Sequence, residues 1–495
     1  MPVPRDYVER VYAGVLGKTI AVYLGRPYEG WTFARIQQEL GDITYYVNDR
    51  RDVPLKHHLL VVTDDDISGT FVFPRVLRDA GIDPTSVDVG EAWLNYIVED
   101  KSVLWWGGMG NSTEHTAYLR LKAGVLPPGS GSTALNGQVV AEQVGAQIFV
   151  EGFAMTCPGD PRGAAELAER AARVSHDGEA INAARVVAAL VAGAFTTRDM
   201  NALLDDGIAV VPPDSLIARI HDDVRGWAAA GDWLATRKRI DEEYGYHRYG
   251  GNCHVVPNHA LVVAALAHSG GAFDDAMTVV CTSGWDTDSN AGNVGAICGV
   301  FGGLTGLTGR DWRGPIADRM YLPAADGGGC VTDAAREAIA LAAIGYRRNG
   351  VAFETAPTVR FHFTLPGSVQ GFQATDSAAV VRNGGSCLTV DRASTVLTPT
   401  FIPPEAQDMP IYGMVAAPTL YAGQTIRAQI SGGARLVVQA YDADDEPRTY
   451  VGPAVRDGEV SWIVPDTGGQ PIVAVGLTTD GPATLHYLTW QGEPT

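Results

Sequence analysis

The hydrophobic pattern of the first two thirds of the chain is helical. Apolar residues recur there at intervals of three and four, and several of these segments contain glycines that allow helices to approach closely. Segments with this pattern are residues 7–24, 67–77, 86–99, 162–174, 179–195, 260–267, 332–347 and a run that starts at residue 273. We therefore predict an all-α domain over residues 1–355.

The pattern changes near residue 358 to short alternating or β-branched runs separated by Gly, Asp and Pro turns. These runs are residues 359–364, 427–430, 435–441, 460–465 and 485–490. They predict a C-terminal β-sandwich of roughly eight strands over residues 356–495, of unknown role. Its aromatic residues Trp462, Tyr487 and Trp490 are more typical of a strand core than of a carbohydrate-binding surface.

Two acidic turns interrupt the helical pattern, each between an apolar run and a helix. One is Thr63-Asp64-Asp65, and the other is Gly284-Trp285-Asp286-Thr287-Asp288-Ser289. Carboxylates and hydroxyls are oxygen ligands for hard divalent cations, and burying carboxylates is costly unless they are paired or metal-bound. Taken singly, the second turn favours a helix N-cap and the first is as compatible with an N-cap as with a metal site, so both interpretations stay open at this point.

Other polar positions suggest weaker site candidates. Glycine-rich stretches at residues 107–113 and 129–137 can present backbone N–H groups to a phosphate or a sugar, but they lack a P-loop lysine. His176 lies on a short turn between two helices, and His254 lies in a loop before another, where a structural role competes with substrate positioning. Glu29 stands on a loop between Pro27 and Gly30, either aimed into a cleft or solvated.

Composition narrows the class of protein. A formal net charge of −20 over 495 residues argues against a nucleic-acid partner. No apolar run reaches membrane-spanning length and the first residues are charged, so we expect a soluble, cytoplasmic protein. The six cysteines form no C-x-x-C pair, which favours free thiols over zinc ligands or disulfides.

Taken together, several motifs resemble the ADP-ribosylglycohydrolase family, which contains the dinitrogenase-reductase-activating glycohydrolases and the ADP-ribosyl-acceptor hydrolases. The residues that carry the resemblance, in the family's order, are the segment 14–29, Thr63-Asp64-Asp65, Ser175-His176, Val256-Pro257 and Gly284-Trp285-Asp286-Thr287-Asp288-Ser289. The resemblance implies an all-α fold that binds two adjacent Mg²⁺ or Mn²⁺ ions and a ribosyl or ADP-ribosyl substrate.

The resemblance also assigns roles position by position. It implies one metal held by Thr63, Asp64 and Asp65, another held by Asp286 and Ser289, and Asp288 as a bridge. Glu29 matches the family's mobile glutamate, a ligand or base, and we expect it to be catalytic together with Asp65 and Asp288. The residues expected to contact substrate are Gly108, Asn111, Ser132, His176 and His254.

The chain also departs from the family pattern. Gly17-Lys18 stands where Gly-Asp is usual, Asp66 stands where a Thr is common, and Leu135-Asn136-Gly137-Gln138 replaces a run that often ends in Met-Arg. Without that arginine the predicted substrate loop has no basic residue for a diphosphate. We therefore expect a smaller ribosyl substrate to be preferred.

The function we expect is a metal-dependent glycohydrolase that cleaves a ribosyl N- or O-glycosidic bond. An alternative is an N-glycosidase of small nucleosides or natural products. A third possibility, of a different class, is a non-catalytic structural or binding protein such as the lens crystallins that resemble this family. The intact aspartates disfavour that third possibility.

Overall fold

The computed structural model describes residues 3–101, 103–409 and 412–494. The chain divides into two compact units, which we call the helical unit and the sheet unit. The helical unit comprises Met1–Leu60, Asp64–Trp312 and Glu337–Phe353, and the sheet unit comprises Val61–Thr63, Arg313–Arg336 and Glu354–Thr495. Within the described ranges, no helix has the length and apolar character needed to cross a membrane.

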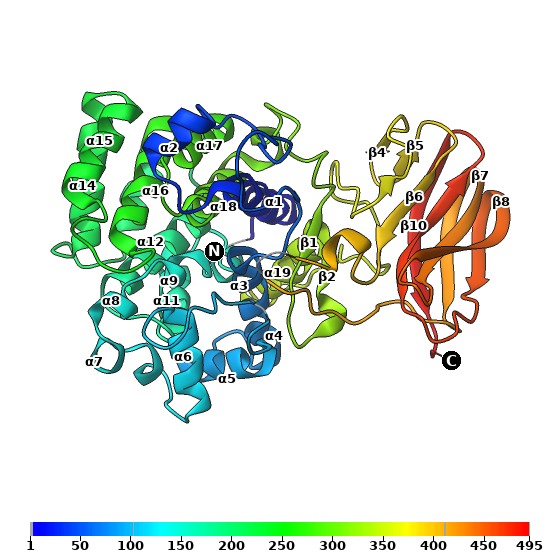
Figure 1. The fold of residues 1–495 in the computed structure, drawn as a ribbon, viewed down its shortest axis with the longest axis horizontal. Helices are drawn as coiled ribbons and strands as arrows, with labels where there is room; N and C mark the ends of the chain where they lie inside the picture. Colours follow the sequence, from blue (N-terminus) through cyan, green and yellow to red (C-terminus); the bar gives the residue numbers. More distant parts are fainter. Residues whose placement is uncertain (1–2, 102, 410–411, 495) are drawn as a thin grey trace. The chain divides into compact units, whose positions relative to one another are not determined.

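Most of the region predicted to be helical is helical, with a few shifts of boundary (Figure 1). The prediction of an all-α domain over residues 1–355 misses two short paired strands, β1 (Arg319–Tyr321) and β2 (Val331–Asp333). Residues 200–250, where the sequence pattern was mixed, also form helices. Helix α16 begins before the predicted residue 260, so His259 lies on the helix rather than in a loop. The helices are α1 (Tyr7–Gly25), α2 (Phe33–Glu39), α3 (Asp65–Val72), α4 (Val76–Asp79), α5 (Ser86–Tyr96), α6 (Thr113–Lys122), α7 (Thr133–Asn136), α8 (Gln138–Ala141), α9 (Gly145–Ile148), α10 (Glu151–Met155), α11 (Pro161–Ala172), α12 (Glu179–Gly193), α13 (Met200–Ile208), α14 (Leu216–Ala230), α15 (Trp233–Tyr244), α16 (Val255–Ser269), α17 (Phe273–Thr282), α18 (Thr287–Gly306) and α19 (Ala334–Arg348).

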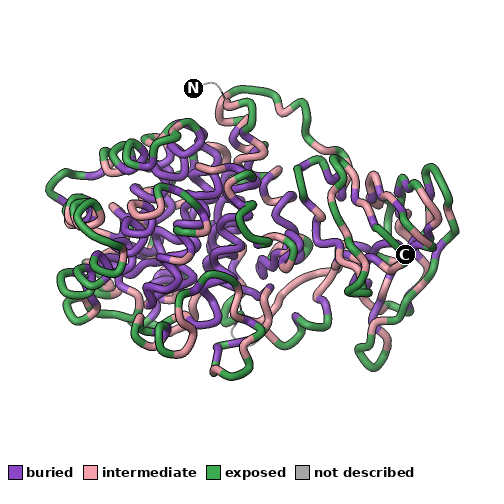
Figure 2. Tube along the Cα trace, turned by 90° about the horizontal axis from the view of Figure 1, so that it is seen from above, coloured by how far each residue is buried: buried purple, intermediate pink, exposed green. Residues whose placement is uncertain are grey.

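Helices α1 and α18 pack against each other (Figure 1) and consist mostly of buried residues. Figure 2 shows that buried residues fill much of the interior of the helical unit. Glycine makes the close approach of the two helices possible. A Cβ atom on Gly17 would lie 2.1 Å from the carbonyl oxygen of Gly295, and one on Gly25 would lie 2.4 Å from that of Thr287. Because the two backbones touch, the end of α1 lies directly against the first turn of α18.

The sheet unit is antiparallel throughout its described strands. Two short strands form a hairpin, and the other eight form one connected sheet in the order β3-β6-β9-β7-β10-β5-β4, with β8 paired to β7. The predicted β-rich region is thus confirmed, but its strands are joined through the long strand β7, and residues 359–364 form only an isolated bridge at Phe361. The strands are β1 (Arg319–Tyr321), β2 (Val331–Asp333), β3 (Gln373–Ala374), β4 (Val381–Asn383), β5 (Leu388–Val390), β6 (Thr395–Pro399), β7 (Thr425–Tyr441), β8 (Pro447–Ile463), β9 (Ile472–Thr479) and β10 (Ala483–Gln491).

The predicted aromatic residues of this unit belong mostly to its interior. Trp462 and Trp490 pack against the apolar cluster of the sheet, and the indole N–H of Trp490 donates to the carbonyl of Thr419 at 2.7 Å. This arrangement agrees with the expectation that strand aromatics are core residues. It places neither indole as a free carbohydrate platform.

Residues 313–336 are tied to the sheet unit through Asp318. Its Oδ2 accepts hydrogen bonds from the Ser368 hydroxyl (2.7 Å) and from the backbone N–H groups of Val369 (2.9 Å) and Gln370 (3.0 Å). A chain cut at the predicted boundary near residue 355 would separate this buried carboxylate from all three donors. We therefore propose that residues 313–336 fold with the sheet.

Candidate functional site

The first acidic turn forms the start of α3. Asp64 is the N-cap, and its Oδ1 accepts hydrogen bonds from the backbone N–H groups of Asp66 (2.9 Å) and Ile67 (3.4 Å). Its Oδ2 makes no hydrogen bond of good geometry, although it lies 3.2 Å from Nε of Arg26. Capping therefore uses one oxygen of Asp64 and leaves the other for a cation.

The second acidic turn forms the start of α18. Asp286 occupies the N-cap position but its side chain makes no capping hydrogen bond. Asp288, in the first turn, accepts a hydrogen bond at Oδ1 from the backbone N–H of Ser289 at 3.0 Å. The carboxylate of Asp286 is therefore not committed to the helix terminus, and the positive end of the helix dipole favours negative charge at both aspartates.

The loop that carries Glu29 is fixed against this second turn by two backbone hydrogen bonds. The N–H of Trp285 donates to the carbonyl of Trp31, and the N–H of Gly30 donates to the carbonyl of Trp285, each at 2.7 Å. Trp285 has φ of 70°, a left-handed conformation that bulky residues rarely adopt. The pairing thus holds a strained turn and places Glu29 beside Asp286.

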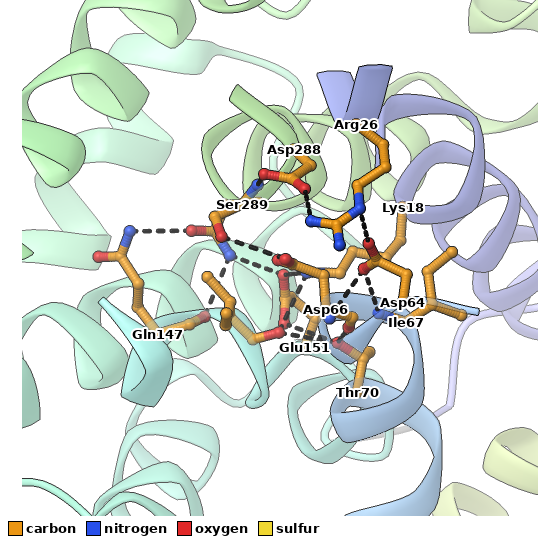
Figure 3. A network of polar contacts seen from close by, with 12 residues as sticks. Lys18, Arg26, Asp64, Asp66, Ile67, Thr70, Gln147, Glu151, Asp288 and Ser289 are labelled. Atoms are coloured by element: carbon orange, nitrogen blue, oxygen red, sulfur yellow. Dashed lines mark hydrogen bonds and ion pairs between the residues drawn. The ribbon is translucent and has the colours of Figure 1, made fainter. Parts of the chain in front are cut away.

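The two turns meet inside the helical unit although their contacting residues are 223 positions apart (Figure 3). The hydroxyl of Ser289 donates to Oδ2 of Asp66 at 3.1 Å. The guanidinium of Arg26 lies between the turns, with Nη1 2.8 Å from Oδ2 of Asp288 and Nε 3.2 Å from Oδ2 of Asp64. Arg26 comes from the end of α1, which the glycine contacts with α18 bring to this point.

The carboxylates of the site form two clusters. In each cluster, one carboxylate oxygen from every residue lies within 4.8 Å of the corresponding oxygens of the others. One cluster is Glu29, Asp286 and Asp288, and the other is Asp64, Asp65 and Asp66. The side chain of Glu29 is 27% exposed, whereas those of Asp64 and Asp288 are 0% and 1% exposed. Glu29 is thus more accessible to solvent than Asp64 and Asp288.

Among the contacts of the described residues, three basic side chains pair with these clusters. Arg26 also pairs with Glu29, and Lys56 lies 2.7 Å from the same carboxylate. Lys18 lies 2.8 Å from Glu151 and 3.6 Å from Asp66. Counting Glu151 with the six clustered acids, seven carboxylates against three cations leave four formal negative charges.

Burial shifts the pKa values of three of these acids upward. It raises the pKa of Asp64 to about 8 and, helped by neighbouring charges, raises the pKa values of Asp66 and Asp286 well above their usual range. Asp288 is also buried, but Arg26 and then Lys56 outweigh the burial and lower the pKa of its carboxyl. The cluster therefore holds its full negative charge only at a cost, which further cations would remove.

The donor set fits divalent cations. All candidate ligands are oxygens, as Mg²⁺ and Mn²⁺ prefer, and buried oxygens of Asp64 and Asp66 make no hydrogen bond. The four excess negative charges equal the charge of two divalent ions. Because Arg26 lies between Asp64 and Asp288, a metal bound by both aspartates requires its guanidinium to move.

One expected result tests the charge of this cluster. Because the folded-state pKa of Asp64 lies above its unfolded value, the folded protein binds more protons between about pH 4 and 8, and the metal-free protein should lose stability as pH rises through this window, by up to about 1.4 kcal/mol per pH unit from this group. Asp64→Asn should remove that slope and raise the Tm in EDTA by a few degrees at pH 8. Thermal unfolding in EDTA at several pH values checks it.

In the same experiment, added Mg²⁺ or Mn²⁺ should stabilise the unsubstituted protein more than Asp64→Asn, because the variant loses a ligand of one ion and keeps the ligands proposed for the other. The exposed pair Lys238 and Glu242 supplies a control. Glu242→Gln should change neither the pH dependence of stability nor the stabilisation by added metal. A metal-free protein whose stability rises between pH 5 and 8 would contradict the repulsion inferred at Asp64.

A buried polar network continues behind the acidic clusters (Figure 3). Glu151 accepts hydrogen bonds from Lys18 and from Asn293 (2.7 Å), and Gln147 donates to Asn293 at 2.9 Å. Beyond Gln147, the network reaches His259 and then His221, each step 3.0 Å long. Lys18, the departure from the family's Gly-Asp, is therefore a fully buried cation beneath the site.

The predicted histidines lie in the interior. The Nε2 of His176 accepts from the backbone N–H of Ala146 at 3.2 Å, its Nδ1 shares a hydrogen bond with Ser175 at 2.7 Å, and burial lowers its pKa to about 3. His254 caps α16 by accepting from Val256 N–H at 3.2 Å. Both rings are thus occupied by protein groups, as expected for structural histidines.

The remaining predicted residues are spread over loops. Asn111 is exposed and accepts a hydrogen bond from Asn252 at 3.1 Å, the N–H of Gly108 donates to His115 at 3.0 Å, and the Ser132 hydroxyl donates to the carbonyl of Gly129 at 3.0 Å. The Thr63 hydroxyl donates to the carbonyl of Tyr412 at 2.6 Å. No hydrogen bond among the described residues joins any of these four groups to the two carboxylate clusters.

Several residues of the site were not singled out from sequence. Arg26 and Lys56 pair with the carboxylates directly, and Asp66 accepts a hydrogen bond from Ser289. Burial, and then the negative charges of Asp286 and, more weakly, Glu29, raise the pKa values of Tyr246 and Cys253. Asp66 had a visible signal, because it adjoins the Thr63-Asp64-Asp65 motif. The other four carry no local signal, because their role depends on contacts across the fold.

Comparisons with known proteins identify the family of the chain. The family model described as ADP-ribosylglycohydrolase matches residues 3–363. A solved structure described as an "ADP-ribosylglycohydrolase-related protein complex" aligns with a TM-score of 0.45 and 19% identity, over 70% of this chain and 99% of that chain. A search of curated proteins gives no match. The chain therefore belongs to the ADP-ribosylglycohydrolase family.

Proposed function

We propose that this protein is a divalent-metal-dependent glycohydrolase that cleaves a ribosyl N- or O-glycosidic bond. The observation that carries the proposal is the meeting of the two acidic turns, joined by the contact between Ser289 and Asp66 and by Arg26 between Asp64 and Asp288. Membership of the family supports a glycohydrolase activity. The excess of buried carboxylates supports the requirement for metal.

The proposed ligands follow the two clusters. Asp64 and Asp65 would hold one ion, Asp286 and Ser289 the other, and Asp288 would be shared. Thr63 stays a proposed ligand through its hydroxyl oxygen, whose hydrogen is already donated to Tyr412. The family resemblance favours Mg²⁺ or Mn²⁺, and two ions would neutralise the four excess charges.

Two bound cations would supply Lewis acidity, orientation of the ribose diol and a water of lowered pKa. In the proposed hydrolysis the C1″–N or C1″–O bond breaks, a C1″–OH bond forms from water, and the leaving group gains a proton. Glu29 would accept the water proton at a carboxylate oxygen, a role that its partly exposed side chain beside Asp286 supports. Asp65 and Asp288 would orient the reacting groups through their metal-ligand oxygens.

The test of the proposed function is hydrolysis by the full chain after treatment with EDTA and addition of Mg²⁺ or Mn²⁺. The substrates are ADP-ribosyl-arginine, ADP-ribosyl-serine and unphosphorylated nucleosides. We expect release of free ribose or ADP-ribose that disappears with EDTA and returns with metal. Tight metal binding with no turnover of any of these substrates would instead favour the non-catalytic alternative.

We further propose that a ribosyl substrate without a diphosphate is preferred. A diphosphate carries about two negative charges that must be met by Arg, Lys or helix N-termini. The three basic side chains that contact the clusters are already ion-paired, Lys18 with Glu151, Arg26 with Asp288 and Lys56 with Glu29.

This preference predicts that kcat/KM is higher for a ribosyl conjugate than for the ADP-ribosyl conjugate of the same leaving group. The measurement compares both substrates at saturating metal. A preference of tenfold or more for the ADP-ribosyl form, about 1.4 kcal/mol of transition-state stabilisation, would show that the small-substrate proposal is wrong while leaving the glycohydrolase proposal intact.

A further inference from the structure

Arg360, in the sheet unit, is stacked on the indole ring of Trp490. Its guanidinium carbon lies 4.6 Å from the ring centroid of Trp490 and 5.9 Å from that of Phe361. Trp490 is held in place by the hydrogen bond from its indole N–H to Thr419. The guanidinium therefore rests on a fixed aromatic surface provided by β10.

Within the described residues, the guanidinium of Arg360 makes no hydrogen bond and no ion pair, and its Nε is buried. The nearby carboxylate, Asp333, is already used, because its Oδ2 lies 2.7 Å from Nε of Arg336 and its Oδ1 accepts the backbone N–H of the same residue at 2.9 Å. Burial, and then the like charge of Arg336, lower the pKa of Arg360. A largely buried, unpaired guanidinium costs free energy that an anion would recover.

A second arginine lies near the same aromatic residue. The guanidinium carbon of Arg336 is 5.8 Å from the centroid of Phe361, and its side chain is 22% exposed. Both arginines therefore lie within 6 Å of the Phe361 ring, and Arg336 is the one paired with the buried carboxylate of Asp333. Such a pair of arginines is unusual in a chain with a net charge of −20, where general electrostatics repel anions.

We propose that Arg360, with the positive charge of Arg336 nearby, is a binding site for a small oxyanion, independent of the metal centre. The ligand group is a carboxylate or a sulfate- or phosphate-type oxyanion, since the planar guanidinium fork matches both. The sheet unit thereby gains a ligand-recognition role that its fold alone does not indicate.

The experiment is isothermal titration of the full chain with sodium sulfate and, separately, with sodium acetate at constant ionic strength. These probes separate a tetrahedral oxyanion from a carboxylate, and the charge of sulfate does not change near neutral pH. We expect saturable binding of one equivalent of at least one probe. Arg360→Met, which keeps apolar cover over Trp490, should weaken it at least tenfold, and Arg360→Lys should weaken it less.

The matched control is Arg392→Met, because Arg392 belongs to the same unit, is exposed and pairs only with its neighbour Asp391 at 3.2 Å among the contacts described. That variant should bind the anion with unchanged affinity. Equal affinity in Arg360→Met and the unsubstituted protein, or the absence of saturable binding of both probes, would overturn the proposal. If Arg360→Met does not fold, the comparison of Arg360→Lys with Arg392→Met decides.

Discussion

Asp288→Ala is expected to remove metal binding and to lower kcat/KM at least about a thousandfold, equivalent to about 4 kcal/mol of transition-state stabilisation. The reason is that Asp288 is buried where the two acidic clusters adjoin, 2.8 Å from Arg26 and within the group that includes Glu29 and Asp286. It is the proposed shared ligand, so both ions should be lost together. The measurements are metal content after dialysis, titration with Mn²⁺ and turnover at saturating metal.

Two further variants serve as a partial-loss comparison and a control for this prediction. Ser289→Ala removes one proposed ligand and the 3.1 Å hydrogen bond to Asp66, so it should weaken one ion by about tenfold and leave the other bound. Asp222→Ala, on the exposed side of α14, should change neither metal content nor turnover. Two ions retained by Asp288→Ala would show that Asp288 is not shared and that the clusters bind independently.

Lys18→Met is expected to destabilise the helical unit by about 3–5 kcal/mol in metal-free protein. Both members of its ion pair with Glu151 have fully buried side chains, and the 2.8 Å contact is supplemented by a hydrogen bond from Lys18 to the carbonyl of Ile148 at 3.0 Å. Burial disfavours the charged lysine, but Glu151 and then Asp66 outweigh it and raise its pKa. Removing the ammonium leaves a buried carboxylate without its cation.

Denaturant unfolding in EDTA, followed by the far-UV helical signal, measures this effect. The double variant Lys18→Met with Glu151→Met should recover part of the loss, because two apolar side chains leave no unpaired charge. Lys238→Met, which disrupts an exposed pair with Glu242, should cost less than about 1 kcal/mol. A loss below 1 kcal/mol for Lys18→Met would mean that Lys18 does not stabilise the acidic site.

Local patterns in the sequence were enough to find the helices that carry the site. The apolar spacing before Asp64 and Asp286 locates the two turns, and the small-residue run after Asp288 marks a helix that packs closely. The glycines of α1 and α18 explain that packing, since a Cβ on Gly17 or Gly295 would meet backbone atoms of the other helix. These features can be predicted from the sequence because the size of each residue, and the backbone conformations open to it, follow from its own type.

The limits of the sequence pattern are equally specific. The segment 359–364 alternates like a strand, yet it contributes only the bridge between Phe361 and Leu488, because strand pairing depends on the partner as well as on propensity. His176 is adjacent to helices that frame the site, but its ring is turned inward to Ser175 and Ala146. Side-chain direction at such positions is set by packing.

By itself, the sequence determined the two-part organisation of helical and β-rich regions, the acidic turns and their family. Tertiary structure alone decided that Arg26 lies between Asp64 and Asp288, that Lys18 supports Asp66 from below, and that Arg360 is left without a carboxylate. The physical reason is that helix and turn signals arise from neighbours in the chain. Electrostatic partners are instead chosen by proximity in space, where residues more than 200 positions apart compete for the same charge.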